Sequence, residues 1–434
     1  NLDTYYYTLV TSFILFIVLF KFGDYDVKPN IFQKILTIFL GYLLIPLVLS
    51  IPFYFSIYNL TFSNSFFEAI SGFTSTGFTV FDNIKLVDQS LIIWRSSTQW
   101  IGGLYFLFSI IYLIDIYDDS FKKTLTNYIS FNSSEILKQV AKIFILYTSL
   151  TILIFIILNI FSIRTFDSLN LALTIISSGG FLPVNELSMI IKENVQIIIF
   201  SLLMLFSFFS LFFSYNLIFL RKKNINFFYE DLHLFVYLIV VVTIFFLFFS
   251  FNFDFFINLF AIISSMTNIG FSLNPGKENL NFIYLILVII GGSFFSTSSG
   301  LRFIKIYSLF KFSLNQILSF SRPKNVFMNK LIFTKINFNL YEINKYFLTI
   351  IIFILSLFIL TSLLSLSGIT FVNSFKLSIL TLMNTVNSSI YGLEEFDFYN
   401  LQLFSKYCLI FFMIVGRIEL LTILLLIKKF LFKN

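Results

Sequence analysis

The sequence predicts an all-α integral membrane protein in which four similar units surround one central pore, with an extra helix at the N-terminus. Three observations predict this fold. The chain has 434 residues, of which 58% are hydrophobic and only 12% are charged, whereas about a quarter of the residues in a soluble domain are charged. Long apolar runs recur along the chain, and backbone groups in lipid must be satisfied within their own helix. Shorter runs that end in small polar residues lie between the long ones.

Nine long apolar segments are predicted to be membrane-spanning helices. The first has no basic flank before it and no small-residue cleavage site after it, so we expect a membrane helix rather than a signal peptide. The other eight form four pairs. The segments lie at about 5–21, 31–58, 90–116, 140–162, 194–220, 232–252, 281–311, 346–367 and 401–430. The pairing divides the chain into an N-terminal helix at 1–30 and pore repeats at 31–120, 121–225, 226–320 and 321–434.

A shorter stretch lies inside each pair. It runs for about ten moderately apolar residues, too few to span a bilayer, and then breaks into Ser, Thr, Asn and Gly. We therefore expect a unit of helix, short re-entrant helix, loop and helix, repeated four times. The stretches are SNSFFEAISGFTSTGFTVFDN (63–83), FDSLNLALTIISSGGFLPVNE (166–186), FDFFINLFAIISSMTNIGFSLNP (253–275) and FVNSFKLSILTLMNTVNSSIYG (371–392).

Charges in the connecting segments predict the orientation. Lysines and arginines gather at 21–34, 122–142, 221–223, 322–335 and 428–433, which predicts a cytoplasmic C-terminus. The opposite side, onto which the four broken stretches open, carries Asp82, Asp88, Glu186, Glu193, Glu278, Glu394, Glu395 and Asp397, offset by Lys85, Lys192 and Lys277. An acidic outer mouth would concentrate cations.

The broken stretches predict an ion path. Irregular backbone at membrane depth is tolerated only where it is buried in protein or lines a wet cavity. A short helix entering from outside points its negative end toward the centre, and the following carbonyls can replace the hydration shell of a cation. Glycine is expected there because it takes positive φ at little cost. One such stretch alone would equally fit an ordinary helix connection, but four in matching positions favour a filter.

These motifs resemble the Trk/Ktr/HKT superfamily of potassium transporters, and within it the bacterial TrkH-type membrane subunits, over about residues 30 to 434. The sequence SGFTSTGFTV resembles the first filter loop of that family. The other resembling motifs are WRSSTQWIGG (94–103), SSGGF (177–181), MTNIGF (266–271), IGGSFFSTSSGLRFIK (290–305) and GRIELLT (416–422).

The resemblance implies twelve filter residues. Where Asn387 stands, the family usually has glycine; asparagine also tolerates positive φ, so the backbone is expected to be kept. Its side chain would add bulk to one quarter of the ring, which leaves strict potassium selectivity open. The filter residues are Ser75, Thr76, Gly77, Ser178, Gly179, Gly180, Asn268, Ile269, Gly270, Thr385, Val386 and Asn387.

The resemblance also implies a gate, an intramembrane loop at 291–300 below the filter; the alternative is a kinked helix packed through small residues. Arg417 would face the pore and raise the barrier for a cation, or else pair with Glu419 or a backbone carbonyl. We expect Arg302 and Lys305 to reach the cytoplasmic surface, and Arg95 to have a structural role near a membrane interface. The gate and pore residues are Gly291, Gly292, Ser296, Thr297, Gly300 and Arg417.

The predicted function is potassium translocation across the cytoplasmic membrane, with K⁺ at the filter, no cofactor in the chain and no enzymatic activity. One cysteine, one histidine and the absence of a phosphate-binding glycine motif argue against redox, metal and nucleotide sites. The net charge of +7 reflects topology rather than nucleic-acid binding. The basic segments could meet anionic lipid, and the family adds a homodimer and a cytoplasmic ring of nucleotide-binding subunits. The alternatives are a sodium-permeable or potassium/sodium-coupled transporter of the same fold, and a secondary transporter of organic solutes.

Overall fold

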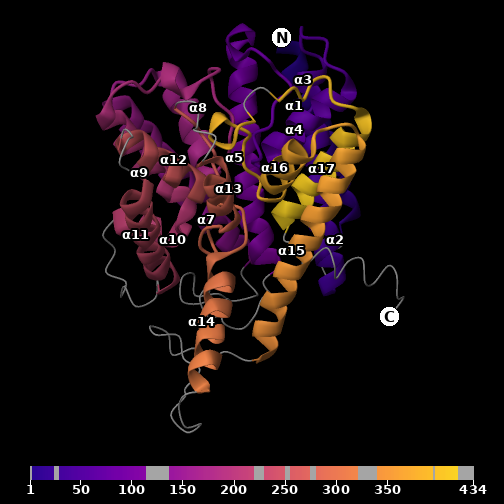
Figure 1. The fold of residues 1–434 in the computed structure, drawn as a ribbon. Helices are drawn as coiled ribbons and strands as arrows, with labels where there is room; N and C mark the ends of the chain where they lie inside the picture. Colours follow the sequence, from indigo (N-terminus) through magenta and orange to yellow (C-terminus); the bar gives the residue numbers. More distant parts are fainter. Residues whose placement is uncertain are drawn as a thin grey trace.

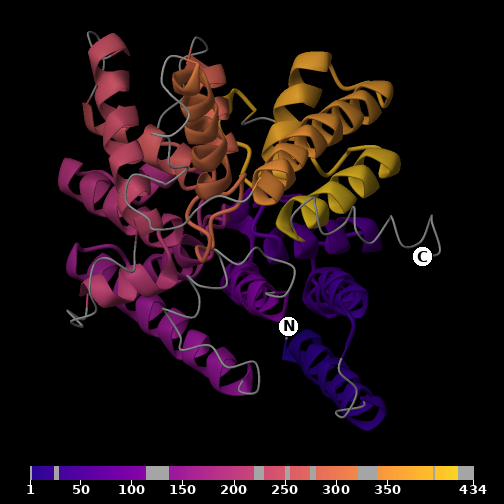
Figure 2. The same cartoon turned by 90° about the horizontal axis from the view of Figure 1, so that it is seen from below.

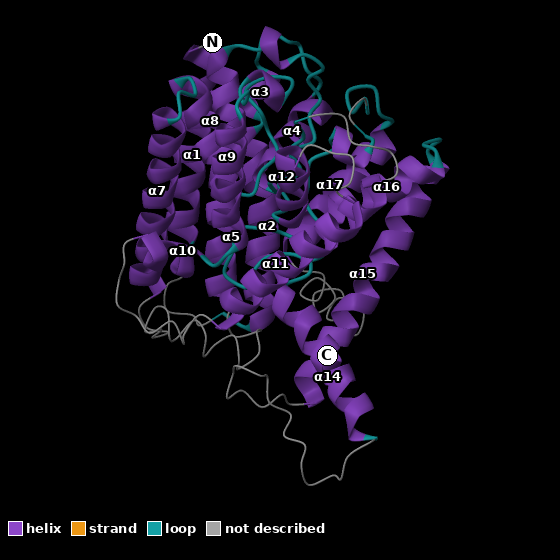
Figure 3. Cartoon of the chain, turned by 60° about the vertical axis from the view of Figure 1, so that its left-hand side comes forward, coloured by secondary structure: helices purple, strands orange, loops and turns teal. Residues whose placement is uncertain are grey.

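The computed structural model describes residues 2–23, 29–113, 136–218, 229–249, 255–273, 280–320, 340–393 and 396–418. In these ranges the chain is helical, with no β-strand and one isolated bridge between Ile290 and Leu301 (Figure 3). The longer helices are α1 (Leu2–Phe22), α2 (Ile31–Leu49), α5 (Gln89–Tyr112), α7 (Ile136–Ile160), α9 (Asn194–Phe208), α11 (Tyr229–Phe249), α14 (Phe303–Ser319), α15 (Leu340–Leu366) and α17 (Leu403–Ile418). The shorter ones are α3 (Ile51–Tyr54), α4 (Phe62–Phe73), α8 (Thr165–Ile176), α10 (Leu211–Ile218), α12 (Phe255–Met266), α13 (Asn281–Ile289) and α16 (Phe371–Leu382).

Five stretches of helix are long and apolar enough to cross a membrane, judged by length and composition: Asp3–Phe22, Ile31–Tyr54, Lys138–Ile160, Tyr229–Phe248 and Glu342–Leu366. Two predicted segments are each split into two helices, 194–220 into α9 and α10, and 281–311 into α13 and α14. The helix α1 lies at the edge of the bundle beside α2 and α3.

The four short stretches form α4, α8, α12 and α16, and each of these helices has 12 residues. Each has a mostly buried second half, because it packs between longer helices. Helix α4 packs against α2 and α5, α8 against α7 and α9, α12 against α13, and α16 against α15 and α17.

The helices follow one another around a centre. Seen from below, the colours run round the molecule in sequence order, and yellow α17 returns to the side of indigo α2 (Figure 2). The helix after each short helix packs against the next short helix: α5 on α8, α9 on α12, α13 on α16 and α17 on α4. The last of these contacts closes the circle. Helix α14 extends below the rest of the bundle (Figure 1).

The interruption in the segment 281–311 is a loop rather than a kink. Between α13 and α14 lies the 290–302 loop, and between α9 and α10 lies a break at Phe209 and Ser210. The two interlock through backbone hydrogen bonds, from Ser293 N to Phe208 O (3.0 Å), from Ser298 N to Ser207 O (3.0 Å) and from Leu211 N to Phe295 O (3.0 Å). The predicted unwound loop is therefore present.

Most of the basic segments that predict the orientation lie outside the described residues. The same is true of Glu278, Glu394, Glu395 and Glu419. The orientation and the repeat boundaries stay predictions.

Candidate functional site

The four short helices end in the same way. After the last helical turn, one residue takes a left-handed conformation: Ser75 (φ 57°), Ser178 (φ 55°), Asn268 (φ 60°) and Asn384 (φ 46°). The N–H of this residue bonds to the carbonyl three residues earlier, and an N–H one or two residues later bonds back to the last full turn. This is the Schellman type of helix end, in which glycine or asparagine usually stands at the left-handed position. Each chain segment therefore turns directly after its short helix.

Hydrogen bonds join the four helix ends into a ring. The second end is bonded to the third, the third to the fourth, and the fourth to the first. These bonds run from Ser178 Oγ to Thr267 O (2.7 Å), from Asn268 Nδ2 to Thr385 Oγ1 (3.4 Å), and from Asn384 Nδ2 to Thr76 Oγ1 (3.0 Å). The first and second ends meet at glycines, because a Cβ added to Gly77 would lie 2.6 Å from the Cα of Gly180.

The second residue after each left-handed position approaches the centre of this ring. Two residues on stand Gly77, Gly180 and Gly270, and at the same place in the fourth stretch stands Val386. A Cβ on Gly180 would lie 2.3 Å from the Cβ of Val386, and a Cβ on Gly270 would lie 3.0 Å from Val386 Cγ1. Gly77 (φ 85°) and Gly270 (φ 80°) have positive φ, whereas Gly180 does not. Glycine at 180 is thus needed for space rather than for conformation.

The expectation that Asn387 takes positive φ is wrong. Counted from the helix end, Asn387 matches Phe78, Phe181 and Phe271, not the glycines. The left-handed residue of the fourth stretch is Asn384, because the turn forms where α16 ends. The Nδ2 of Asn387 donates instead to Leu393 O (3.1 Å) within its own segment.

Above the ring lies a cavity of about 410 Å³, which residues from all four stretches line. Gly77, Gly180, Gly270 and Val386 contribute to its wall, and Asp82, Glu186 and Asp397 give it carboxylates. Burial alone would raise the pKa of Asp397, but hydrogen bonds from Asn400 N (3.1 Å) and Asn400 Nδ2 (2.7 Å) lower the pKa below its ordinary value. This carboxylate therefore stays charged.

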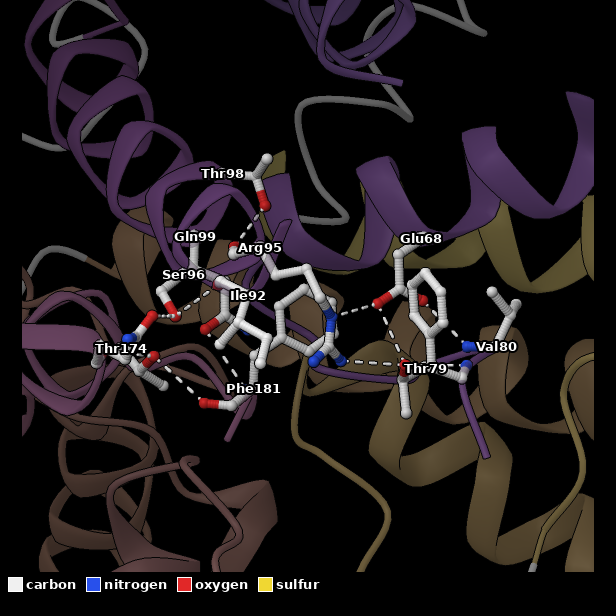
Figure 4. A network of polar contacts seen from close by, with 12 residues as sticks. Glu68, Thr79, Val80, Ile92, Arg95, Ser96, Thr98, Gln99, Thr174 and Phe181 are labelled. Carbon is white, nitrogen blue, oxygen red and sulfur yellow. Dashed lines mark hydrogen bonds and ion pairs between the residues drawn. The ribbon is translucent and has the colours of Figure 1, made fainter. Parts of the chain in front are cut away.

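A buried ion pair holds the first stretch (Figure 4). Arg95 Nε on α5 donates to Glu68 Oε1 on α4 at 2.8 Å, and the two side chains are 1% and 0% exposed. Arg95 Nη2 donates to Thr79 Oγ1 (2.9 Å), Thr79 Oγ1 donates to Glu68 Oε1 (3.0 Å), and Val80 N donates to Glu68 Oε2 (2.9 Å). Arg95 therefore has a structural role: with Glu68, it ties the segment at Thr79 and Val80, which follows the first loop, to α4 and α5.

Polar side chains hold the second and third stretches. Phe181 N donates to Gln99 Oε1 (3.3 Å), and Thr174 Oγ1 donates to Phe181 O (3.2 Å), as Figure 4 shows. The third stretch repeats the latter bond, from Ser264 Oγ to Phe271 O (2.8 Å). Ile269 turns away from the ring and is fully buried in the surrounding hydrophobic core. Gly179 leaves room for the Gln99 side chain, since a Cβ there would lie 2.3 Å from its Oε1.

The 290–302 loop touches the ring from the other side. Ser298 Oγ donates to Asn268 Oδ1 (2.8 Å), and Thr297 Oγ1 donates to Ile176 O (2.7 Å) at the end of α8. Three glycines allow the loop its close packing: Gly300 has φ 78° and lies against Gly291, and a Cβ on Gly292 would meet Phe208 O at 2.3 Å. Ser296 Oγ donates to Ser293 O (2.8 Å) inside the loop.

Arg417 links this loop to the ring. Its side chain is 1% exposed, Nη1 donates to Ser299 Oγ, and Nη2 donates to Ser75 Oγ at 3.4 Å. The guanidinium carbon lies 4.3 Å from the centre of the Phe106 ring, a cation–π distance. The predicted orientation toward the pore fits these contacts, and the alternative partner Glu419 lies outside the described residues.

No family model matches the chain. It is 25% identical over 421 residues to an uncharacterized cation transporter of Methanocaldococcus jannaschii, covering 91% of this chain and 82% of that protein. It is 24% identical over 463 residues to the Trk system potassium uptake protein TrkG of Escherichia coli, covering 98% and 92%. The crystal structure of the potassium transporter TrkH from Vibrio parahaemolyticus has the same fold, with a TM-score of 0.77 and 19% identity over 94% of this chain and 87% of that one.

The chain is a relative of the TrkH-type potassium transporter subunits. The resemblance inferred from its motifs is confirmed. These relatives are named as transporters rather than enzymes, and the apolar helices of this TrkH-type chain make it a multi-pass membrane protein.

Two expectations about charged residues of the TrkH-type chain are wrong. Arg302 does not reach a surface; it is 4% exposed, and its Nη1 donates to Ser293 O (3.1 Å), Ser296 Oγ (3.3 Å) and Ser298 O (2.9 Å). Lys305 is also buried. For Arg302 the physical reason is that the carbonyls of the 290–302 loop turn toward the start of α14 and need donors.

Sequence reasoning missed two acids at the start of α11 in this TrkH-type chain. Glu230 Oε1 accepts from Phe294 N (2.7 Å) in the 290–302 loop. Asp231 accepts from Ser210 N (2.8 Å) and Ser210 Oγ (2.7 Å) at the break between α9 and α10. Two adjacent carboxylates at the N-terminus of a helix are an ordinary pattern, so only the breaks in the following segments could have indicated their role.

Proposed function

We propose that the chain conducts potassium ions across the cytoplasmic membrane through a filter of four re-entrant loops, arranged as four pseudo-repeats around one pore. The observation that carries the proposal is the hydrogen-bonded ring of four helix ends beneath one acidic cavity. The named relatives include potassium uptake proteins of the Trk system.

The ring suits a dehydrated cation. Four short helices end at it, and the C-terminal end of a helix carries partial negative charge. The turn after each helix frees backbone carbonyls from helical bonding, and such oxygens can replace water around an ion. The proposed filter residues are those predicted from the sequence in the first three loops, and in the fourth loop the set shifts by one residue to Asn384, Thr385 and Val386.

The 290–302 loop is proposed to be the gate. It bonds to the third helix end through Ser298 and to Arg417 through Ser299, so it lies against the inner side of the ring. A cation leaving the filter would meet the Arg417 charge, which raises the barrier. Glu230 accepts a hydrogen bond from a backbone N–H of the loop, and Arg302 donates to a backbone carbonyl of the loop, so both side chains hold it in place.

A sodium-permeable or potassium/sodium-coupled transporter of the same fold is the second candidate. The observation that favours it is the fourth stretch, where Val386 and Asn387 stand in place of glycine and phenylalanine. A transporter of organic solutes would hold its substrate in discontinuous spanning helices, which fits less well with a cavity lined by the four loops.

The same proposal includes membrane lipid, a second copy of the chain and a cytoplasmic ring of nucleotide-binding subunits as partners, with the C-terminus in the cytoplasm. These rest on the resemblance.

The test is cation uptake in potassium-starved cells that lack their own potassium uptake systems. Wild-type protein should restore potassium uptake, and Gly77→Ser and Gly180→Ser should lower the ratio of potassium to sodium uptake, because a Cβ at either place meets another loop. Leu202→Ala, at an exposed position on α9, is the control. Unchanged selectivity in both glycine variants, with normal insertion, would refute the filter assignment.

A further inference from the structure

We propose that Val386 is the residue that limits which cations pass the ring, because its side chain reaches across the centre of the ring. The inference rests on the proposed function and names a specificity-determining residue in it.

The order of the four loops around the ring follows from their hydrogen bonds. The three side-chain hydrogen bonds join the second loop to the third, the third to the fourth, and the fourth to the first. The second and fourth loops are therefore opposite each other, not neighbours.

The Val386 side chain reaches toward the second and third loops. A Cβ on Gly180, in the opposite loop, would lie 2.3 Å from Val386 Cβ, 2.9 Å from Cγ2 and 3.0 Å from Cγ1. On the neighbouring third loop, a Cβ on Gly270 would lie 3.0 Å from Cγ1. A side chain of the fourth loop that touches both must extend over the middle of the ring. Val386 also lines the cavity above it, together with the three glycines.

A valine side chain at this place hinders a passing cation. Its two methyl groups offer no oxygen to a cation, so an ion that has lost water gains nothing from this side chain. Its branched Cβ has few rotamers, so the group does not easily turn aside. Gly180 and Gly270 leave the space into which the methyl groups fit. The larger the cation, the more the side chain must be displaced.

Asn387 is the competing residue, because it stands where the motif of related transporters has glycine. Its amide is turned toward Leu393 O, away from the ring. Val386 and Asn387 are adjacent in sequence, and they make a matched pair for a test.

The experiment compares uptake of potassium, rubidium and caesium by cells carrying Val386→Gly, Val386→Ala, Val386→Ile and Asn387→Gly, normalised to the protein found in the membrane. We expect uptake to fall in the order glycine, alanine, valine, isoleucine at position 386, with at least a several-fold gain for Val386→Gly that is greatest for caesium. Asn387→Gly should behave as wild type.

A flat series at 386, or a change of selectivity in Asn387→Gly alone, would overturn the inference while leaving potassium uptake by the wild type intact. Failure of the wild type to carry any of the three cations would refute the proposed function itself. If Val386→Gly does not insert, the alanine and isoleucine variants still decide the order.

Discussion

The first and fourth stretches have the same kind of helix end and different residues after it. Both short helices have 12 residues, both are followed by a left-handed residue, Ser75 or Asn384, and both bond back to the last turn at 2.9 Å. At the centre of the ring, however, one presents Gly77 and the other Val386. The comparison teaches that one kind of helix end can precede different residues and a different backbone, since φ is 85° at Gly77 and is not positive at Val386.

The two stretches also differ in how they are held. Outside the ring, the first is tied by the Glu68–Arg95 ion pair, whereas the fourth is tied by Asn384 Nδ2, which donates to Met413 O (2.9 Å) on α17. A buried charge pair and a single amide should respond very differently to substitution.

The largest expected effect is that of Glu68→Gln. The change keeps the shape but leaves the buried Arg95 charge uncompensated, which should lower the free energy of unfolding by about 3–5 kcal/mol. Thermal unfolding of the purified protein in detergent measures it. Glu186→Gln removes an exposed carboxylate from the same cavity and serves as the control. Equal stability of the two variants would mean that the ion pair does not anchor the first stretch.

Arg417→Ala comes next, because Arg417 bonds to Ser75 of the first stretch and to the 290–302 loop. Removing the charge should raise cation flux several-fold, by more than it lowers the amount of protein in the membrane. Flux per inserted molecule is the measurement. Loss of inserted protein with unchanged flux per molecule would instead assign Arg417 a structural role.

A smaller effect should separate Asn384→Gly from Ser75→Gly. Both changes relieve a positive φ. Ser75→Gly removes the long bond from Arg417 Nη2 (3.4 Å), whereas Asn384→Gly removes the shorter bonds to Met413 O (2.9 Å) and Thr76 Oγ1 (3.0 Å). We expect Asn384→Gly to be destabilising by about 1–2 kcal/mol and Ser75→Gly to be neutral or stabilising by about 0.5 kcal/mol. Denaturation midpoints of the two variants decide; the reverse order would contradict the idea that the helix end, not the side chain, sets the first loop.

The smallest effect concerns the cavity rim. Because the pKa of Asp397 is lowered, its charge is present above the ordinary aspartate pKa and is lost only as the pH falls through the lowered value. Asp397→Asn should therefore weaken potassium uptake modestly, at low ionic strength more than at high, with no change of that effect between neutral and mildly acidic pH. An effect that vanishes at mildly acidic pH would show that Asp397 is already protonated there.

The sequence predicts the helices well and the contacts between them poorly. The short helices are bounded by small polar residues that any reading of hydropathy finds, and the loop at 291–300 follows from its glycines and serines. The sequence motif aligns Asn387 with the glycines of the other loops. The structure aligns Val386 with them, because each loop begins where its short helix ends, and α16 ends at Leu382. Hydropathy does not indicate that Arg302 donates hydrogen bonds inside the protein. Its acceptors are backbone carbonyls of the 290–302 loop, and their positions depend on the fold of that loop. Nor did it pair Arg95 with Glu68, which stands 27 residues earlier.

The interlocking of the 290–302 loop with the break between α9 and α10 has a mechanical consequence. Phe208 O, Ser207 O and Phe295 O each accept a backbone N–H from the other segment. If the loop swung away, these oxygens would be stripped of donors at membrane depth unless water followed the loop inward. Movement of the loop would then either admit water to the break or carry α9 and α10 along with the loop.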